Sequence, residues 1–134
     1  MFQRTKRNKK YANARKKANT KKYFAIHLIA EFWHGKVTED KRKIKQILIK
    51  ATKLSKSIPL EVAIHKFSPH GITGVIILAE SHIAIHSWPE INYAAIDIFT
   101  CGKKSNPYKA LEYLKKEFRP KKVKIREINR GSKR

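Results

Sequence analysis

The sequence predicts an α+β fold in which two helices pack on one face of an antiparallel sheet. Six segments rich in β-branched and aromatic residues are separated by turn residues, which is typical of strands. Two other segments carry apolar residues at helical spacing. Most connections between the strands are too short for a crossover, so neighbouring strands are expected to be antiparallel. The predicted order is β-α-β-β-β-β-α-β, a two-layer sandwich.

The first strand and the first helix are predicted near the start of the folded part. Residues 23–33 are mostly apolar and favour a strand. Thr38 or Asp40 is a suitable N-cap for a helix that ends before Pro59. The apolar positions of this helix recur at helical spacing, at Ile44, Ile47, Leu48, Ala51 and Leu54.

Four strands follow in the middle of the sequence. Residues 60–67 alternate between two faces, and residues 72–80 form a long apolar run. Residues 82–87 continue in extended form, and residues 93–99 form the next strand. Turn residues separate these segments, which favours consecutive antiparallel pairs.

The second helix and the last strand complete the predicted domain. Asn106 and Pro107 are good starting residues for a helix, because proline suits the first helical position. Pro120 stops this helix, and residues 123–128 suggest a final strand. The apolar face of the helix carries Ala110, Leu111, Leu114 and Phe118.

The charge of the chain is its most unusual bulk property. The 134 residues suffice for one modest core, but they carry a formal net charge of +22. Residues 1–22 hold ten Lys or Arg and no acid, so this arm is expected to be disordered. We expect weak contact with RNA, DNA or another polyanion through the arm, against the alternative of a solvated extension. Residues 23–134 then form a single domain.

Hydropathy and cysteine content argue against a membrane-spanning protein and against a secreted protein. No apolar run approaches the roughly 20 residues of a membrane span. The N-terminal region has no apolar segment typical of a secretory signal. A single cysteine cannot form an internal disulfide, which favours a reducing, cytoplasmic location.

Residues 80–101 gather reactive side chains in a run that otherwise predicts buried strand. The run reads ESHIAIHSWPEINYAAIDIFTC and contains two His, two Glu and the only Cys of the chain. Polar reactive groups beside buried strands are costly unless they are paired. Such a concentration therefore indicates a functional site.

The same stretch resembles the small prokaryotic S-adenosylmethionine decarboxylases. ESHIAIHSWPE and YAAIDIFTCG are similar to the processing and active-site signature of that family. The flanks HKFSPHGITGVIILAE, NPYKALEYL and KVKIREINRG agree in order and spacing, so the resemblance covers about residues 23–131. It implies an α+β sandwich paired as a homodimer. It also implies decarboxylation of S-adenosylmethionine for spermidine biosynthesis.

The resemblance further implies that the chain is a proenzyme that cuts itself between Glu80 and Ser81. The Ser81 hydroxyl attacks the Glu80 carbonyl carbon through a five-membered ring and forms an ester. β-Elimination then separates residues 1–80 from residues 81–134, and hydrolysis leaves a pyruvoyl group derived from Ser81. This covalent group is the implied cofactor. It holds the substrate as a Schiff base and accepts the electron pair left by CO2.

Five further residues match functional positions of the family. His86 matches the base of the processing elimination, and Thr73 stands where the family usually has a serine that bonds the ring intermediate. Cys101 matches the proton donor to the carbon that loses CO2. Phe67 matches an aromatic that stacks on adenine, and Glu90 matches an acid that binds the ribose hydroxyls. Without the resemblance, each is equally an ordinary core or surface residue.

Four alternatives remain open. The same chemistry could serve arginine or ornithine, or the scaffold could be a non-catalytic, basic polyanion-binding protein. A zinc site of His82, His86 and Cys101 is disfavoured, because two histidines four residues apart on a strand are roughly 13 Å apart. A hydrolase pair of Ser81 and His86 is disfavoured because no nucleophile elbow surrounds the serine.

Overall fold

The structure is a computed structural model that describes residues 24–131. The basic arm predicted for residues 1–22 lies outside the described residues. The strands and helices are β1 (Ala25–Trp33), α2 (Lys41–Leu54), β2 (Pro59–Lys66), β3 (Ile72–Leu78), β4 (Ser81–Trp88), the 3-10 helix η2 (Pro89–Ile91), β5 (Tyr93–Cys101), α3 (Pro107–Phe118) and β6 (Lys122–Arg130).

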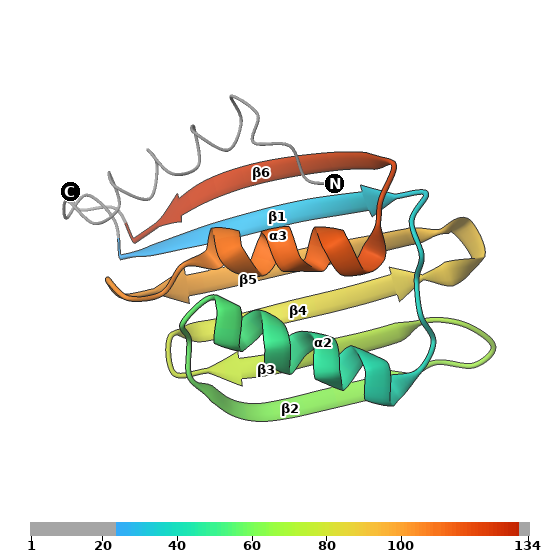
Figure 1. The fold of residues 1–134 in the computed structure, drawn as a ribbon, viewed down its shortest axis with the longest axis horizontal. Coiled ribbons are helices and arrows are strands. Elements are labelled where there is room, and N and C mark those ends of the chain that lie inside the picture. Colours follow the sequence, from blue (N-terminus) through green and yellow to red (C-terminus); the bar gives the residue numbers. More distant parts are fainter. Residues whose placement is uncertain (1–23, 132–134) are drawn as a thin grey trace.

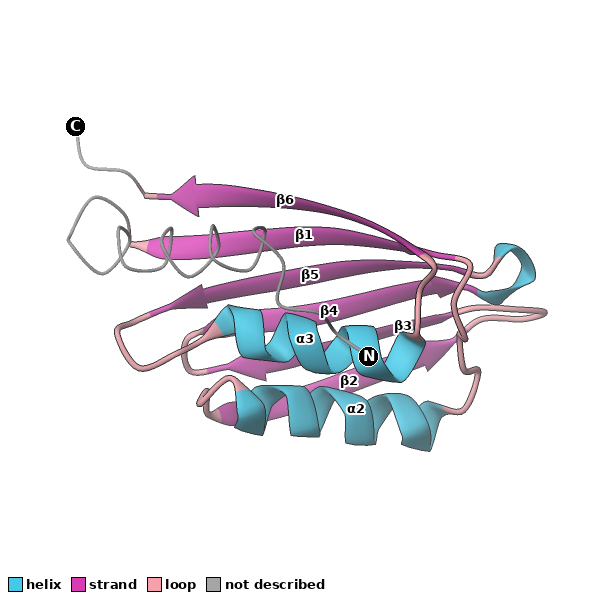
Figure 2. Ribbon diagram, turned by 45° about the horizontal axis from the view of Figure 1, so that its top comes forward, coloured by secondary structure: helices cyan, strands magenta, loops and turns pink. Residues whose placement is uncertain are grey.

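The strands form one antiparallel sheet in the spatial order β2-β3-β4-β5-β1-β6. Helices α2 and α3 lie side by side on one face of this sheet, and the opposite face carries no element of the described chain (Figures 1 and 2). Helix α2 packs over β2 and β3, whereas α3 packs over β5 and β1. The predicted fold class and element order are confirmed.

The core lies between the sheet and the two helices, and the alternation along each strand explains it. In β5, Ala94, Ile96, Ile98 and Thr100 are buried, whereas the residues between them are only half-buried. The buried residues face the helices, because successive side chains of a strand point to opposite faces. The half-buried set lies on the face without helices, which we call the open face.

Side-chain caps and a left-handed residue set the helix ends. Of the two predicted caps of α2, Asp40 is the N-cap: its side chain accepts a hydrogen bond from the amide of Arg42 at 2.9 Å. Asn106 caps α3 in the same way. Helix α3 ends at Phe118, and Arg119 follows with φ 46°, ahead of Pro120. No helix of the described part is both long and apolar enough to cross a membrane.

The predicted strand boundaries around the reactive stretch need correction. Strand β3 ends at Leu78 rather than at residue 80, because Leu78 pairs directly with Ser81 of β4. Ala79 and Glu80 therefore form a two-residue hairpin turn. Strand β5 also runs past residue 99 to Cys101, because its pairing with β1 continues to Ala25.

Candidate active site

The Glu80–Ser81 peptide bond lies at the hairpin turn between β3 and β4, and its backbone is strained. Ser81 has φ 151°, and it is the one residue from Leu78 to Ser81 with a positive φ. Two-residue hairpins usually place glycine or asparagine where φ is positive. A residue with a β-carbon in such a region costs on the order of 1–3 kcal/mol. The strain therefore lies at the residue predicted to react.

Cys101 supplies two hydrogen-bond donors to the carbonyl oxygen of Glu80. The backbone amide of Cys101 lies 3.2 Å from this oxygen, and the Sγ atom lies 2.9 Å from it. Donors held in this way stabilise the negative charge that develops on a carbonyl oxygen under attack. The arrangement can therefore activate the Glu80 carbonyl toward the neighbouring hydroxyl.

Ile58, just beyond α2, holds the turn from the other side. Its carbonyl oxygen accepts a hydrogen bond from the amide of Ala79 at 2.9 Å, and its amide donates to Glu80 Oε1 at 3.0 Å. One residue therefore fixes both members of the turn. The Glu80 side chain acts as an anchor for the strained peptide, in addition to its predicted place in the cleavage pair.

A buried set of serine contacts connects the loop after Cys101 to the end of α2. Ser57 Oγ and Ser105 Oγ are 2.8 Å apart, and the amide of Asn106 donates to the carbonyl oxygen of Ser55 at 2.7 Å. The three serines are buried. The end of α2 thus positions both the turn at residues 79–80 and the strand end that carries Cys101.

The anchor predicts different effects for two substitutions of Glu80. Glu80→Ala removes the acceptor for the Ile58 amide, which lowers the fraction of molecules whose turn is in the reactive conformation. We therefore expect self-cleavage to slow about 5- to 10-fold. Glu80→Gln retains an oxygen acceptor, and cleavage is expected to stay within about twofold of the parent rate. A time course on denaturing gels measures both rates. Equal slowing of the two variants would show that the carboxylate charge matters, rather than the hydrogen bond.

Thr73 and His86 form a second group at the opposite end of the same strands. They are directly paired across β3 and β4, and Thr73 Oγ1 lies 3.1 Å from His86 Nδ1. Because the threonine hydroxyl engages one ring nitrogen, the other nitrogen is the one available to exchange a proton. Phe67, in edge contact with His65, and Glu90, exposed in η2, lie at this end as well.

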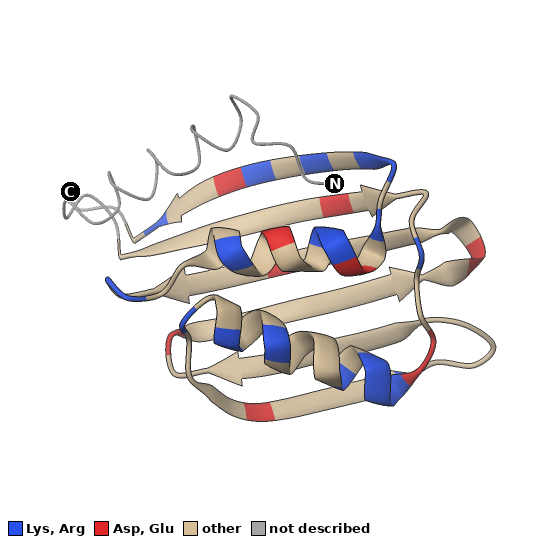
Figure 3. Cartoon of the chain, in the orientation of Figure 1, with Lys and Arg blue, Asp and Glu red and all other residues tan. Residues whose placement is uncertain are grey.

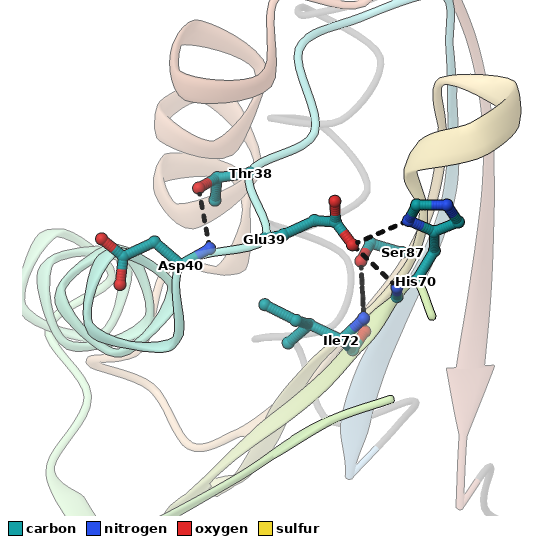
Figure 4. A network of polar contacts seen from close by, with 7 residues as sticks. Thr38, Glu39, Asp40, His70, Ile72 and Ser87 are labelled. Atoms are coloured by element: carbon teal, nitrogen blue, oxygen red, sulfur yellow. Dashed lines mark hydrogen bonds and ion pairs between the residues drawn. The ribbon is translucent and has the colours of Figure 1, made fainter. Parts of the chain in front are cut away.

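A polar network behind this second group fixes its position (Figure 4). Glu39 Oε1 accepts from the amide of Gly71 at 3.3 Å and lies 3.4 Å from His70 Nδ1. Ser87 Oγ accepts from the amide of Ile72 at 2.9 Å. Ile72 and Ser87 are the chain neighbours of Thr73 and His86. Their contact on the helix-facing side of the sheet therefore fixes the position of Thr73 and His86, whose side chains lie on the open face.

The structure thus divides the seven predicted site residues into two groups. The cleavage group contains Glu80, Ser81 and Cys101, and the imidazole group contains Phe67, Thr73, His86 and Glu90. Ser81 and His86 are five residues apart on one strand, which corresponds to about 16 Å. Within one chain, His86 is therefore too far from Ser81 to serve as its base.

Between the two groups, the open face carries a network that the sequence analysis left without a role. His27 Nε2 lies 3.0 Å from Asp97 Oδ1, and Arg130 Nη1 lies 3.4 Å from His27 Nδ1. His82 stacks on Phe99 with ring centroids 5.7 Å apart. Burial, together with the nearby His27, lowers the pKa of His82, although Asp97 opposes the shift. A neutral His82 is therefore favoured on this face.

Aromatic and apolar side chains also gather on the open face. Tyr93 lies between Trp33 and Trp88, with centroid separations of 4.1 and 5.3 Å. Burial and the hydrogen bond to Glu31 raise the pKa of Tyr93 to about 12, so its hydroxyl stays protonated. Four large apolar side chains of this face are 41–48% exposed, namely Phe67, Ile77, Trp88 and Ile128.

Several contacts at the site could not be recognised in the sequence. Ile58 contributes only backbone atoms, which leave no mark on residue type. Ser57 and Ser105 are 48 residues apart in the sequence, and their contact depends on how the loop after β5 packs beside the end of α2. Among the described residues, no three His, Cys, Asp or Glu side chains gather closely enough to hold a metal ion.

Comparison with known proteins adds an independent finding. Residues 26–131 match the sequence model of the family described as S-adenosylmethionine decarboxylase. The S-adenosylmethionine decarboxylase proenzyme of Moorella thermoacetica is 43% identical over 107 residues, which cover 78% of this chain and 86% of the relative. That of Methanococcus maripaludis is 40% identical over 112 residues, which cover 82% and 92%.

A solved structure agrees with the sequence relatives. The crystal structure of the adenosylmethionine decarboxylase from Aquifex aeolicus superposes with a TM-score of 0.77 at 32% identity. The superposition covers 84% of this chain and 95% of that chain. The similarity therefore extends over most of this chain and nearly all of the solved one.

Proposed function

This chain belongs to the S-adenosylmethionine decarboxylase family, and we propose that it cuts its own backbone before Ser81 and then decarboxylates S-adenosylmethionine. The observation that carries the proposal is the double hydrogen bond from Cys101 to the carbonyl oxygen of Glu80, directly before the strained Ser81. A carbonyl activated in this way, next to a hydroxyl nucleophile, is arranged for attack on the main chain.

The self-cleavage uses atoms that the chain itself supplies. The Ser81 hydroxyl oxygen bonds to the Glu80 carbonyl carbon, and the Ser81 nitrogen leaves it, so that an ester replaces the amide. A base then removes the α-proton of Ser81, and Glu80 departs as a carboxylate. Addition of water releases ammonia and leaves a carbonyl at residue 81. The Cys101 amide and thiol stabilise the oxygen of Glu80 during the attack.

The pyruvoyl group supplies the electron sink that amino-acid decarboxylation needs. The residues around position 81 fit such a group, because Cys101 places a free thiol beside it. Once the Glu80 carbonyl has moved away, this thiol can deliver a proton to the substrate carbon. A free thiol that must stay reduced also fits a cytoplasmic location.

We propose that the complete site forms between two copies of the chain. The cleavage group and the imidazole group lie at opposite ends of the strands, so one copy cannot join them. Two open faces packed about a twofold axis bring the Ser81 end of one copy to the His86 end of the other. The exposed apolar side chains Phe67, Ile77, Trp88 and Ile128 favour burial of this face.

The choice of substrate follows from Phe67 and Glu90, two residues of the set that we call the imidazole group. Phe67 offers an exposed aromatic face for the adenine ring, and Glu90 offers a carboxylate for the ribose hydroxyls. Arginine and ornithine have no ring to stack and no ribose. The relatives bear the name of S-adenosylmethionine decarboxylase, which favours the nucleoside substrate over the two amino acids.

Release of CO2 from three labelled substrates tests this function. The cleaved protein is expected to release CO2 from S-adenosylmethionine, and rates with arginine or ornithine are expected to be at least about 100-fold lower. Faster release from either amino acid would replace the proposed substrate but keep the chemistry. No release from any of them, by protein that has cut itself, would overturn the enzymatic proposal.

A further inference from the structure

The solvent side of helix α2 is a strongly basic surface. The helix contains six Lys or Arg and no acid, and all six are exposed. Its apolar residues Ile44, Ile47 and Leu48 are buried in the core, so the exposed side is polar. Figure 3 shows the basic residues along this helix and few acidic residues near them.

The stability of the helix itself does not explain the cations in its first turn. Cations in the first turn of a helix oppose its dipole, whose N-terminal end is already positive, yet Lys41, Arg42 and Lys43 all lie there. Two acids precede the helix, but both are engaged: Asp40 caps the N-terminus, and Glu39 contacts His70 and Gly71. These two carboxylates offset part of the charge of the first turn, and the helix itself carries no acid to offset the rest.

The six cations fall into two sets. Lys43 lies 3.9 Å from Glu117, and Lys50 lies 5.3 Å from the centre of the Tyr113 ring, so both turn toward α3. The others lie on the outer side or toward β2 by helical spacing. We call Lys41, Arg42, Lys45 and Lys53 the α2 surface. From residue 42 to residue 53 it extends about 16 Å at 1.5 Å per residue.

We propose that the α2 surface binds the phosphate backbone of duplex nucleic acid. A line of cations of this length matches several consecutive phosphates, and each contact releases condensed counterions. The surface offers no exposed aromatic ring and no acid for base recognition, so we expect binding without sequence preference. RNA and DNA duplexes are therefore expected to bind with similar affinity.

Membranes and protein partners fit this surface less well. A helix that binds a membrane inserts a row of large apolar side chains next to its cations, whereas on α2 only Leu54, at the last residue, is exposed, and Ile44, Ile47 and Leu48 face the core. The centre of a protein interface is depleted of lysine. The two helices cover one face of the sheet (Figure 2), and the Thr73–His86 pair lies on the opposite, open face, so nucleic acid bound to α2 would not cover that pair.

The test compares two triple variants of the full chain. Arg42, Lys45 and Lys53 are replaced with glutamine in one, and Lys121, Lys122 and Lys124 in the other. The second set removes the same charge from β6 and the residue before it, at the opposite edge of the sheet from the strands under α2. All six residues are exposed, so both variants are expected to fold. Fluorescence anisotropy with a labelled 20-base-pair RNA duplex, at several salt concentrations, gives the salt dependence of binding.

We expect the parent chain to bind the duplex with an affinity that falls steeply as salt rises. The α2 variant is expected to lose about 2 to 3 units from the slope of log K against log salt, at about 0.9 per phosphate contact. The β6 variant is expected to lose less than about one unit. Equal losses in the two variants would show that net charge alone attracts the duplex. Such equal losses would overturn the proposal. It would also be overturned by an unchanged slope in the α2 variant, or by binding to anionic vesicles but not to duplexes.

Discussion

Replacement of Ser81 with alanine is expected to leave the chain uncut and without decarboxylase activity. Alanine removes the hydroxyl oxygen that is proposed to attack the Glu80 carbonyl, and the two Cys101 donors then face a carbonyl without its neighbouring hydroxyl. Without the new carbonyl at residue 81, the protein has no electron sink for the substrate. Intact mass and denaturing gels measure the cleavage, and CO2 release measures the activity. A cut or active alanine variant would refute the proposed origin of the cofactor.

Two further replacements separate chemistry from backbone strain at this position. Ser81→Cys keeps a nucleophile in place and is expected to retain slow cleavage. Ser81→Gly removes both the nucleophile and the β-carbon that makes φ 151° unfavourable. The glycine variant should therefore stay uncut, yet unfold at a higher temperature than the alanine variant. If alanine and glycine gave equal unfolding temperatures, the turn would not be strained in solution.

Most of the fold could be predicted because local patterns and the tertiary structure agree. The helical spacing of Ile44, Ile47, Leu48 and Ala51 predicted buried positions of α2, although Leu54, predicted with them, is 43% exposed. The side chains of Asp40 and Asn106 are caps that mark the helix starts. The end of β3 was predicted two residues late, because the apolar run continues through Ala79 into the turn. An apolar run predicts which residues are buried, but it does not predict where the strand ends. The end of β3 is set by the pairing of Leu78 with Ser81.

The site was less predictable than the fold. The match to a family signature identified Glu80, Ser81 and Cys101 together, and the structure places these three in contact at one strand end. The same match placed His86 with them, although the extended geometry of β4 carries it about 16 Å away. A linear motif records which residues act in a site, but it does not record which copy of the chain supplies each one.

Co-expression of two inactive variants is expected to restore self-cleavage in one of them. Ser81→Ala lacks the nucleophile, and His86→Ala lacks the proposed base, so each is expected to stay uncut alone. In a mixed dimer, the Ser81 of the His86→Ala chain meets the intact His86 of the other copy. With random pairing, about half of the His86→Ala chains are in mixed dimers, so about half are expected to be cut. Tags of different length identify the chains on a denaturing gel.

The mixed dimer tests the shared site rather than the fold of either variant. The second site of each mixed dimer lacks both residues, so the Ser81→Ala chain must stay whole in the same sample. As a matched control, His34→Asn replaces an exposed histidine at the same end of the sheet with a residue that tolerates its φ of 60°, and it should be cut with or without a partner variant. Cleavage of His86→Ala by itself would show that His86 is not the base. Failure to cleave in co-purified mixed dimers would show that His86 supports cleavage from within its own chain, and it would refute the shared site.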